Sequence, residues 1–152
     1  MPCVNPTVGT CGGTVVKLVG AVDDPMPDPW LTSRADLREE VGFTKRAAVD
    51  IGEELVLYAI PQRKIIGIAV VASHPIKSGK EERWPWRSKI RLTIAIDAYS
   101  RAPSLEDIEE PGRRLSQSVQ RQSHIKLSWT EYKLAQSALR DACDPSCGDI
   151  CN

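Results

Sequence analysis

Residues 83–87 of this 152-residue chain read Arg-Trp-Pro-Trp-Arg and contain the side-chain types that a base-stacking site needs. Two of the four Trp of the chain flank Pro85, and Arg83 and Arg87 bracket them. A flat indole can stack on a nucleobase, and a guanidinium beside it can hold a phosphate. The alternative is that one or both indoles pack in the hydrophobic core.

Aromatic and cationic residues elsewhere in the chain could complete such a site. The candidate base pocket consists of Trp84, Trp86, Trp30 and Tyr58. The candidate phosphate contacts are Arg83, Arg87, Lys89 and Arg63. Trp30 ends a proline-rich loop and could instead plug the end of a sheet, and Tyr58 could only cap the core.

Groups that would support catalysis or metal binding are poorly placed. The glycine-rich stretch 9–13 precedes an expected strand, whereas a phosphate-binding loop follows one. His74 and His124 lack metal-ligand spacing to another His, Cys or carboxylate. Adjacent carboxylates such as Glu53 and Glu54 point apart on a strand or a helix. We therefore expect no enzyme, no cofactor and no metal site.

Lysine and arginine are concentrated in two segments, although the formal net charge is zero. Residues 62–91 and 113–140 carry an excess of basic side chains, and residues 21–61 carry an excess of acidic ones. If the two basic segments share a face, that face favours phosphate or another polyanion. The commoner role of a charge run is to solvate the exterior of a sheet or helix.

The length and apolar content favour one domain with a hydrophobic core. No stretch approaches the roughly 20 apolar residues that span a bilayer. The first residues lack the basic and apolar regions of a secretory signal. We therefore expect a cytoplasmic protein without a membrane partner.

The cysteines lie only near the two ends of the chain, at Cys3, Cys11, Cys143, Cys147 and Cys151. Without an export signal, we expect reduced thiols on short, dangling tails. The spacing of the last three does not match the usual Cys-x2-Cys pairs of zinc sites. A metal held jointly by both ends is the alternative.

Alternating and β-branched segments predict the strands that would position these residues. These segments are residues 14–22, 54–60, 64–72, 89–99 and 123–127. The second and third form an expected hairpin. Gly67, in the middle of the third, indicates a bulge or the close approach of another group.

Helix-start spacings predict three helices. They cover residues 33–41, a short segment from Ser104 to Pro111, and the segment opened by Ser128 and Glu131 that runs to about Ala142. The expected fold is α+β, with a curved, mostly antiparallel sheet or small open barrel flanked by two or three short helices. Its expected parts are a flexible lead (1–13), one domain (14–142) and a Cys-containing tail (143–152).

The order of several segments resembles the EVE domain family, which has the PUA-like fold and is related to YTH and ASCH domains. The matching pieces are Gly52, Tyr58, Ile66-Gly67-Ile68, Trp84-Pro85-Trp86-Arg87 and Ser128-Trp129-Thr130-Glu131-Tyr132. The resemblance covers about residues 14–142. In the family a Gly-Asp turn is usual, where this chain has Gly52-Glu53.

The resemblance implies a non-catalytic module that reads a flipped, modified base of DNA or RNA in an aromatic pocket. It also implies a role in modification-dependent restriction or defence. One alternative is an ASCH-like small amidohydrolase on a modified nucleoside, which would need Lys64 or Lys89 to meet Thr93 and a Glu. The other is a protein-interaction domain that docks through exposed Trp. The sequence leaves open the base, DNA versus RNA, and the oligomeric state.

Overall fold

The computed structural model describes residues 14–19, 25–43, 50–60, 62–77, 84–108 and 124–151, with side chains at all of these positions except 124 and 125. The expectations on the lead segment 1–13 and on Arg83 lie outside the described residues.

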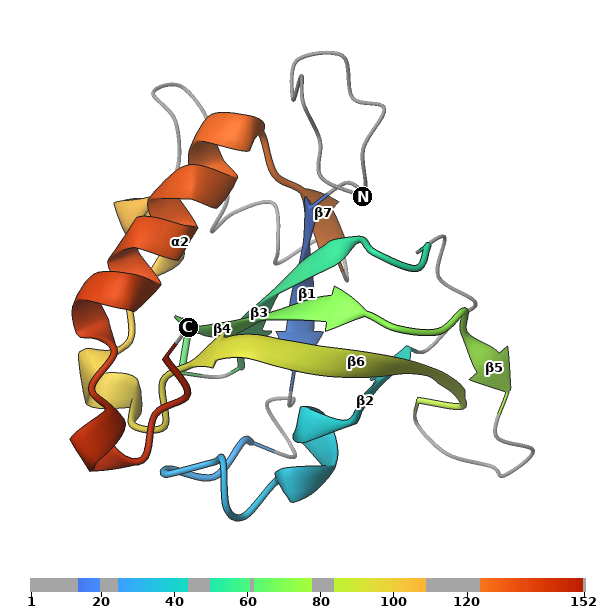
Figure 1. The fold of residues 1–152 in the computed structure, drawn as a ribbon, viewed down its shortest axis with the longest axis horizontal. Helices are drawn as coiled ribbons and strands as arrows, with labels where there is room; N and C mark the ends of the chain where they lie inside the picture. Colours follow the sequence, from blue (N-terminus) through green and yellow to red (C-terminus); the bar gives the residue numbers. More distant parts are fainter. Residues whose placement is uncertain are drawn as a thin grey trace.

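A curled mixed sheet runs through the molecule (Figure 1). Its strands are β1 (Thr14–Val19), β2 (Glu40–Phe43), β3 (Glu54–Ala59), β4 (Lys64–Val71), β5 (Ile76–Lys77), β6 (Trp86–Ala95) and β7 (His124–Lys126). They are ordered β2-β6-β4-β3-β1-β7, and β5 pairs with β6 off this path. β1 runs parallel to β3, while the other strand pairs are antiparallel. The expected α+β, PUA-like fold is confirmed, with the sheet curled into a half-barrel.

One long helix, α2 (Trp129–Ala142), lies against β4 and β6 (Figure 1). The predicted capping box starts it: Ser128 Oγ accepts the Glu131 N–H at 3.1 Å, and Glu131 Oε1 accepts the Ser128 N–H at 2.9 Å. The other described helices are single 3₁₀ turns, namely η2 (Ala35–Arg38), η3 (Tyr99–Arg101), η4 (Leu105–Asp107) and η5 (Pro145–Cys147). None of the helices in the described ranges is long and apolar enough to cross a bilayer.

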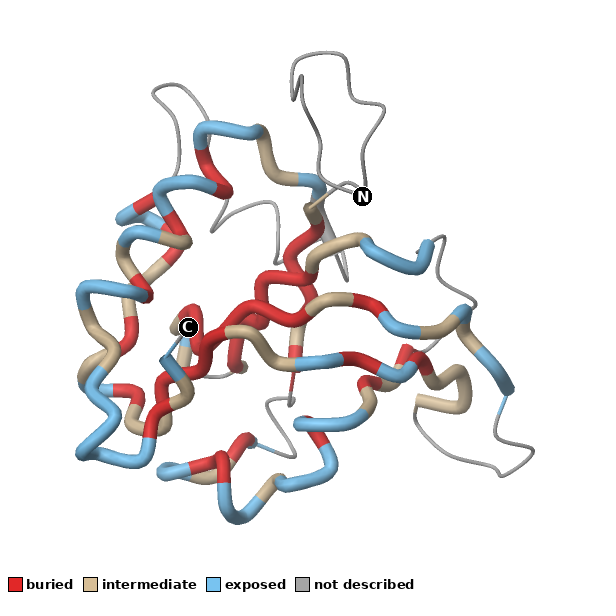
Figure 2. The backbone as a smooth tube through the Cα atoms, in the orientation of Figure 1, coloured by how far each residue is buried: buried red, intermediate tan, exposed pale blue. Residues whose placement is uncertain are grey.

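The core is centred on β3 and β4, which are buried along most of their length (Figure 2). Tyr132, Ala135 and Leu139 of α2 bury one side of the helix, at the three- and four-residue spacing of a single helix face. The opposite side of the helix is exposed (Figure 2). The helix therefore packs one of its sides against the sheet and exposes its opposite side to solvent.

The predicted hairpin of β3 and β4 is confirmed, and so is the close approach at Gly67. Leu57 pairs with Gly67, and the register shifts directly after it. A Cβ at Gly67 would lie 2.6 Å from the carbonyl oxygen of Ile94. Because that neighbour is backbone, only glycine fits where β4 and β6 come together.

The helix predicted over residues 33–41 is wrong in its second half. η2 ends at Arg38, and the chain continues as β2. Val41 and Phe43 are buried, Glu40 and Gly42 are half-buried, and all of β2 pairs with β6. Long-range pairing and the alternating apolar residues override the local helix-start signal. The same pairing starts β6 at Trp86, before the predicted position 89.

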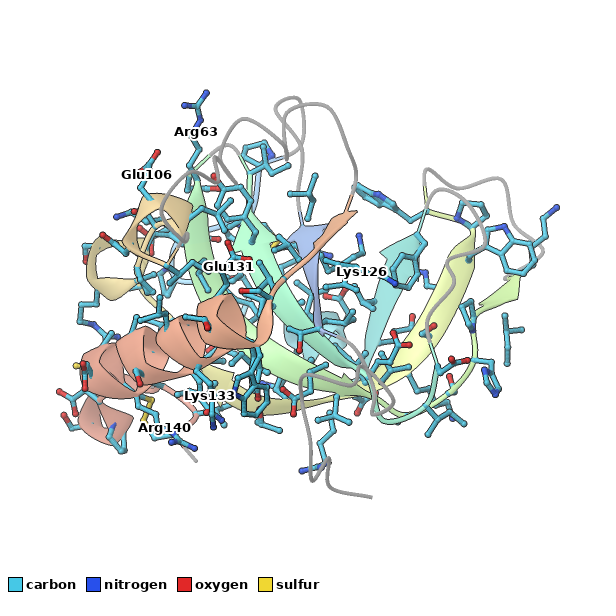
Figure 3. The ribbon with its side chains drawn as sticks, turned by 90° about the horizontal axis from the view of Figure 1, so that it is seen from above. Arg63, Glu106, Lys126, Glu131, Lys133 and Arg140 are labelled. Carbon is cyan, nitrogen blue, oxygen red and sulfur yellow. A yellow bond between two sulfur atoms is a disulfide. The ribbon has the colours of Figure 1, made fainter. Side chains whose placement is uncertain are left out.

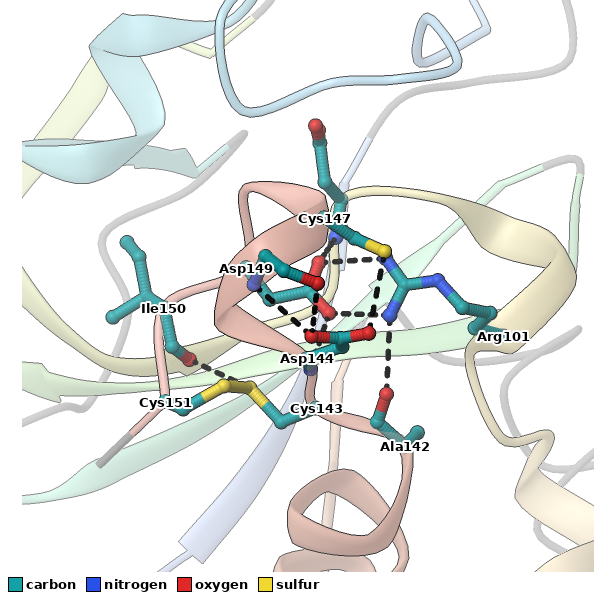
Figure 4. Close-up of a disulfide and its surroundings, with 10 residues drawn as sticks. Arg101, Ala142, Cys143, Asp144, Cys147, Asp149, Ile150 and Cys151 are labelled. Carbon is teal, nitrogen blue, oxygen red and sulfur yellow. Dashed lines mark hydrogen bonds and ion pairs between the residues drawn. A yellow bond between two sulfur atoms is a disulfide. The ribbon is translucent and has the colours of Figure 1, made fainter.

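The expectation of reduced, dangling thiols is wrong for Cys143 and Cys151, which form a disulfide (Figure 4). Ile150 holds this end of the chain against β6, because its N–H and carbonyl exchange hydrogen bonds with Ala95 at 3.0 and 2.8 Å. Cys147 is an exposed, free thiol. A backbone bridge therefore brings the two disulfide partners together.

A buried carboxylate completes this attachment (Figure 4). Asp149 accepts the backbone N–H groups of Asp97 and Asp144 at 2.8 and 2.9 Å and forms a two-pronged ion pair with Arg101. Burial alone would raise the pKa of the Asp149 carboxyl, but these hydrogen bonds outweigh it and lower the pKa. We call Arg101, Asp149 and the Cys143–Cys151 disulfide the C-terminal cluster.

Candidate functional site

A small cavity opens between β1 and β2, on the open side of the half-barrel. These strands are not neighbours in the sheet, but its curl brings them together: Lys17 Nζ on β1 lies 5.0 Å from the ring centroid of Phe43 on β2. The polar and aromatic side chains in the wall are Lys17, Arg34, Arg87 and Trp84. We call this space the seam cavity.

The seam cavity has room for a small group. The centre of a water-sized sphere can move through about 40 Å³ of it. This is more than the space that a single ordered water needs, so a substituent or a single ionic group fits inside.

Gly42 allows Trp84 to form one wall of the cavity. A Cβ at Gly42 would lie 2.6 Å from the Trp84 Cβ, closer than real carbon atoms approach. The indole directly precedes Pro85 and is half-buried. It is therefore held against β2 at the cavity without being sealed in the core.

Two arginines of the wall are engaged by carboxylates. Arg87 lies 3.2 Å from Glu40 across the β2–β6 pair, and both side chains are partly exposed. Arg34 contacts Asp36 through two nitrogens at 3.0 and 3.1 Å. The hydrogen bond from Arg34 is the main reason that the pKa of Asp36 is lowered. Their positive charge is therefore partly compensated at the rim.

Lys17 is the buried cation of the site, with 6% of its surface exposed. Its Nζ donates to the Leu18 carbonyl at 2.7 Å and lies over the Phe43 ring. Within the described part of the chain, no carboxylate forms an ion pair with it. Burial lowers the pKa of the Lys17 amine to about 8, because a desolvated ammonium is disfavoured.

The structure brings two of the described predicted residues to the cavity, Trp84 and Arg87. Trp86 is half-buried, lies opposite Phe43 and Lys77 in the sheet, and packs against the core. Lys89 is exposed on β6 and does not line the cavity. The paired indoles therefore do not face the same space.

The prediction that Trp30 and Tyr58 belong to the base pocket is corrected by the structure. Trp30 is 0% exposed, and its indole N–H donates to the Ile96 carbonyl at 2.7 Å, so it plugs the sheet from inside. Tyr58 is also buried in the core, and burial raises the pKa of its hydroxyl. Neither side chain lines the seam cavity.

Arg63 is exposed at the hairpin turn, with a φ of 60°, and points away from the body of the molecule (Figure 3). It lies on the side of the molecule that carries Glu106, away from β2 (Figure 3). Arg63, predicted as a phosphate contact, therefore does not lie with Trp84 at the seam cavity.

The residues proposed for the amidohydrolase alternative do not line the cavity. Thr93 donates its hydroxyl to the Ile68 carbonyl at 3.2 Å, and Lys89 is exposed. Neither these two nor Lys64 contributes to the cavity wall. No group of three or more His, Cys, Asp or Glu within the described ranges is arranged to hold a metal ion.

Sequence reasoning missed Lys17 and Arg34. For Lys17 a signal exists, because it interrupts the β-branched run Val15-Val16-Lys17-Leu18-Val19, where a charge must be buried or paired. Arg34 is placed by the short turn Thr32–Arg34 before η2, and its N–H donates to the Trp30 carbonyl at 2.7 Å. No local pattern identifies that contact.

Comparisons with known proteins identify the fold. No family model matches the chain, and no curated protein matches it. Protein Atu2648 from Agrobacterium tumefaciens has a TM-score of 0.52 at 16% identity, over 84% of this chain and 93% of that one. Rpa0253 from Rhodopseudomonas palustris has a TM-score of 0.57 at 12% identity, over 84% and 92%. A hypothetical protein from Leishmania major has a TM-score of 0.54 at 11% identity, over 86% and 96%.

These likenesses establish the architecture and name no ligand. The three structures are each matched over more than nine-tenths of their length. At such low identity, side chains at the seam cannot be transferred between the proteins. The function must therefore be argued from the cavity of this chain.

Proposed function

We propose that this protein is a non-catalytic nucleic-acid-binding module that reads a modified base at the seam cavity. The observation that carries the proposal is the cavity wall, where the half-buried indole of Trp84 stands beside Lys17, Arg34 and Arg87. Stacking of a base on an aromatic ring contributes about 1–3 kcal/mol, which can offset much of the cost of unstacking it.

The size of the cavity suggests how the base would be held. The base stacks on Trp84 at the mouth, and its modifying group enters the space beyond, which admits a few non-hydrogen atoms. Arg87 and Arg34 at the rim attract the sugar–phosphate backbone, with Lys89 as a further contact on β6. This arrangement is sequence-tolerant, because every base has a flat face and every nucleotide a phosphate.

The resemblance to EVE domains supports the same proposal. The Trp-Pro-Trp-Arg segment that carries the resemblance contributes both Trp84 and Arg87 to the cavity wall. The PUA-like fold agrees with that family. By extension, we propose modified DNA or RNA as the partner and modification-dependent restriction or defence in the cytoplasm as the setting.

Fluorescence anisotropy with labelled oligonucleotides tests the proposal. Short DNA and RNA strands that carry one modified base, and their unmodified counterparts, are titrated with the full chain at low salt. We expect modified strands to bind more tightly, with affinity falling as salt increases. Trp84→Ala should weaken binding about tenfold or more, since it removes the stacking surface.

The matched control is Trp129→Ala, which removes an indole that is 46% exposed on α2 and does not line the cavity. This variant should bind the oligonucleotides like the unaltered protein. Trp86→Ala, in the sheet beside the cavity, should have an intermediate effect through the position of Trp84. The proposal fails if no modified strand binds at low salt, or if Trp84→Ala and Trp129→Ala behave alike.

A further inference from the structure

The wall of the seam cavity includes a lysine, Lys17, whose ammonium group has no described counter-ion. Lys17 Nζ has one described hydrogen-bond acceptor, the Leu18 carbonyl at 2.7 Å, and the face of Phe43 at 5.0 Å. An ammonium group has three donors, so the carbonyl uses only part of its capacity. The other cations of the wall each have a carboxylate, Glu40 for Arg87 and Asp36 for Arg34.

We propose that the seam cavity is an oxyanion-binding site, in which a carboxylate or phosphate oxygen of the ligand contacts Lys17. This inference goes beyond base reading and does not depend on it, because an isolated small anion would suffice. A nucleotide would supply the oxyanion as a phosphate, and a small metabolite or an acid-modified base would supply a carboxylate.

Charge and size both favour an oxyanion over a neutral ligand. A buried cation is costly unless a counter-charge and hydrogen bonds compensate it, and an oxyanion provides both. Arg34 and Arg87 add positive potential at the same wall, where their partners at the rim compensate it only in part. About 40 Å³ is open to the centre of a water-sized sphere, so the cavity admits a small ionic head group.

The binding should depend on pH with a definite sign. Burial sets the pKa of the empty site at about 8, and a bound anion stabilises the charged amine and raises that pKa. Affinity is therefore greatest below about pH 8. Above it, one proton must be taken up for each anion bound, so the dissociation constant should increase about tenfold per pH unit.

The other charged groups at or beside the described cavity wall form two ion pairs. Arg34 pairs with Asp36, and Arg87 pairs with Glu40. On β7, the residue in register with Lys17 is His124. A transition in anion affinity centred near pH 8 indicates Lys17.

Isothermal titration calorimetry on the full chain tests the proposal with sulfate and acetate, whose charges are constant between pH 6 and 10. Sulfate represents the phosphate source and acetate the carboxylate source, and tighter binding of one identifies the ligand class. Repeating the titrations in two buffers of different ionisation enthalpy counts the protons. We expect nearly one proton taken up at pH 9, and almost none at pH 6.5.

Lys17→Met keeps the length of the side chain and removes its charge. It should weaken anion binding at pH 7 by about tenfold or more and abolish the proton uptake. The matched control is Lys133→Met on α2, whose side chain lies away from β2 (Figure 3) and should leave both quantities unchanged. Should Lys17→Met not fold, the pH profile of the unaltered chain still decides.

Three results would overturn the inference. One is the absence of binding of both anions at pH 7 and low salt. Another is a proton uptake that persists in Lys17→Met. The third is a dissociation constant that shows no transition near pH 8. Because the oligonucleotide test depends on Trp84 and this one on Lys17 with ligands that have no ring, failure of either proposal is distinguishable from failure of the other.

Discussion

The seam cavity and the C-terminal cluster both place charged groups in the interior, but they satisfy them differently. In the C-terminal cluster, Asp149 is paired with Arg101 and accepts two backbone N–H groups. In the seam cavity, Lys17 has a carbonyl and a ring as its described contacts. A carboxylate whose acceptor sites are already used has none to offer a ligand, so the C-terminal cluster contributes to stability. An undersaturated cation beside an open space is suited to binding.

The comparison predicts that removing the Asp149 charge has the largest effect on stability. Asp149→Asn removes the charge from a buried acceptor and should lower the free energy of unfolding by about 3 kcal/mol, because hydrogen bonds to a charged group contribute about 1.5–3 kcal/mol each. Urea denaturation at pH 7 measures this. Asp141→Asn, at an exposed site on α2, is the control and should change stability little.

The pH dependence of the free energy of unfolding tests whether the Asp149 charge is responsible. Because the folded-state pKa of Asp149 is below its ordinary value, its contribution is present above about pH 4 and lost as the pH falls further. The stability difference between the unaltered chain and Asp149→Asn should therefore shrink in acid. A difference that stays constant from pH 7 to pH 2 would show that the charge is not what stabilises this region.

The charge on Lys17 should destabilise the fold, whereas the charge on Asp149 stabilises it. Its pKa falls from 10.5 to about 8 on folding, so the unfolded chain holds the proton more tightly between these values. The free energy of unfolding should therefore rise with pH from about 8 to 10.5, by up to about 3 kcal/mol. Denaturation at several pH values without added anions measures the rise. Lys17→Met should remove it, and Lys133→Met should retain it.

The disulfide gives the smallest expected effect. Cys143 and Cys151 are eight residues apart, so closing this loop stabilises the fold by about 2 kcal/mol. A reducing agent should lower the melting temperature by several degrees. Cys147→Ser should not change the response to reduction, since that thiol is free. No change in melting temperature would mean that Ile150 and Asp149 alone hold this end of the chain.

Local patterns predicted the elements that local forces determine. The alternation in 54–60 and 64–72 and the Ser128–Glu131 capping box each correspond to an observed strand or helix. The identity of β2 depends on pairing with β6, which no helix-start signal reports. Sequence could therefore give the hairpin and the last helix, while the edge strand needed the assembled sheet.

The candidate site was only half predictable for the same reason. Trp84 and Arg87 come from one short segment, and its composition indicated them. Trp30 was assigned to the pocket because its partner, the Ile96 carbonyl, is 66 residues away and invisible in the local sequence. Lys17 reaches the site only because the curl of the sheet brings β1 against Phe43. Burial and long-range closure decide which aromatic and cationic residues face the cavity.

The strand order has a consequence for solubility during folding. The two ends of the described sheet are β2, with four residues, and β7, with three. Short edge strands offer few unpaired N–H and C=O groups to a neighbouring chain, and Glu40 and Lys126 add charge to these strands. The long apolar strands β3 and β4 lie in the middle, already paired on both sides. The sheet thereby shields its most aggregation-prone segments from intermolecular strand addition.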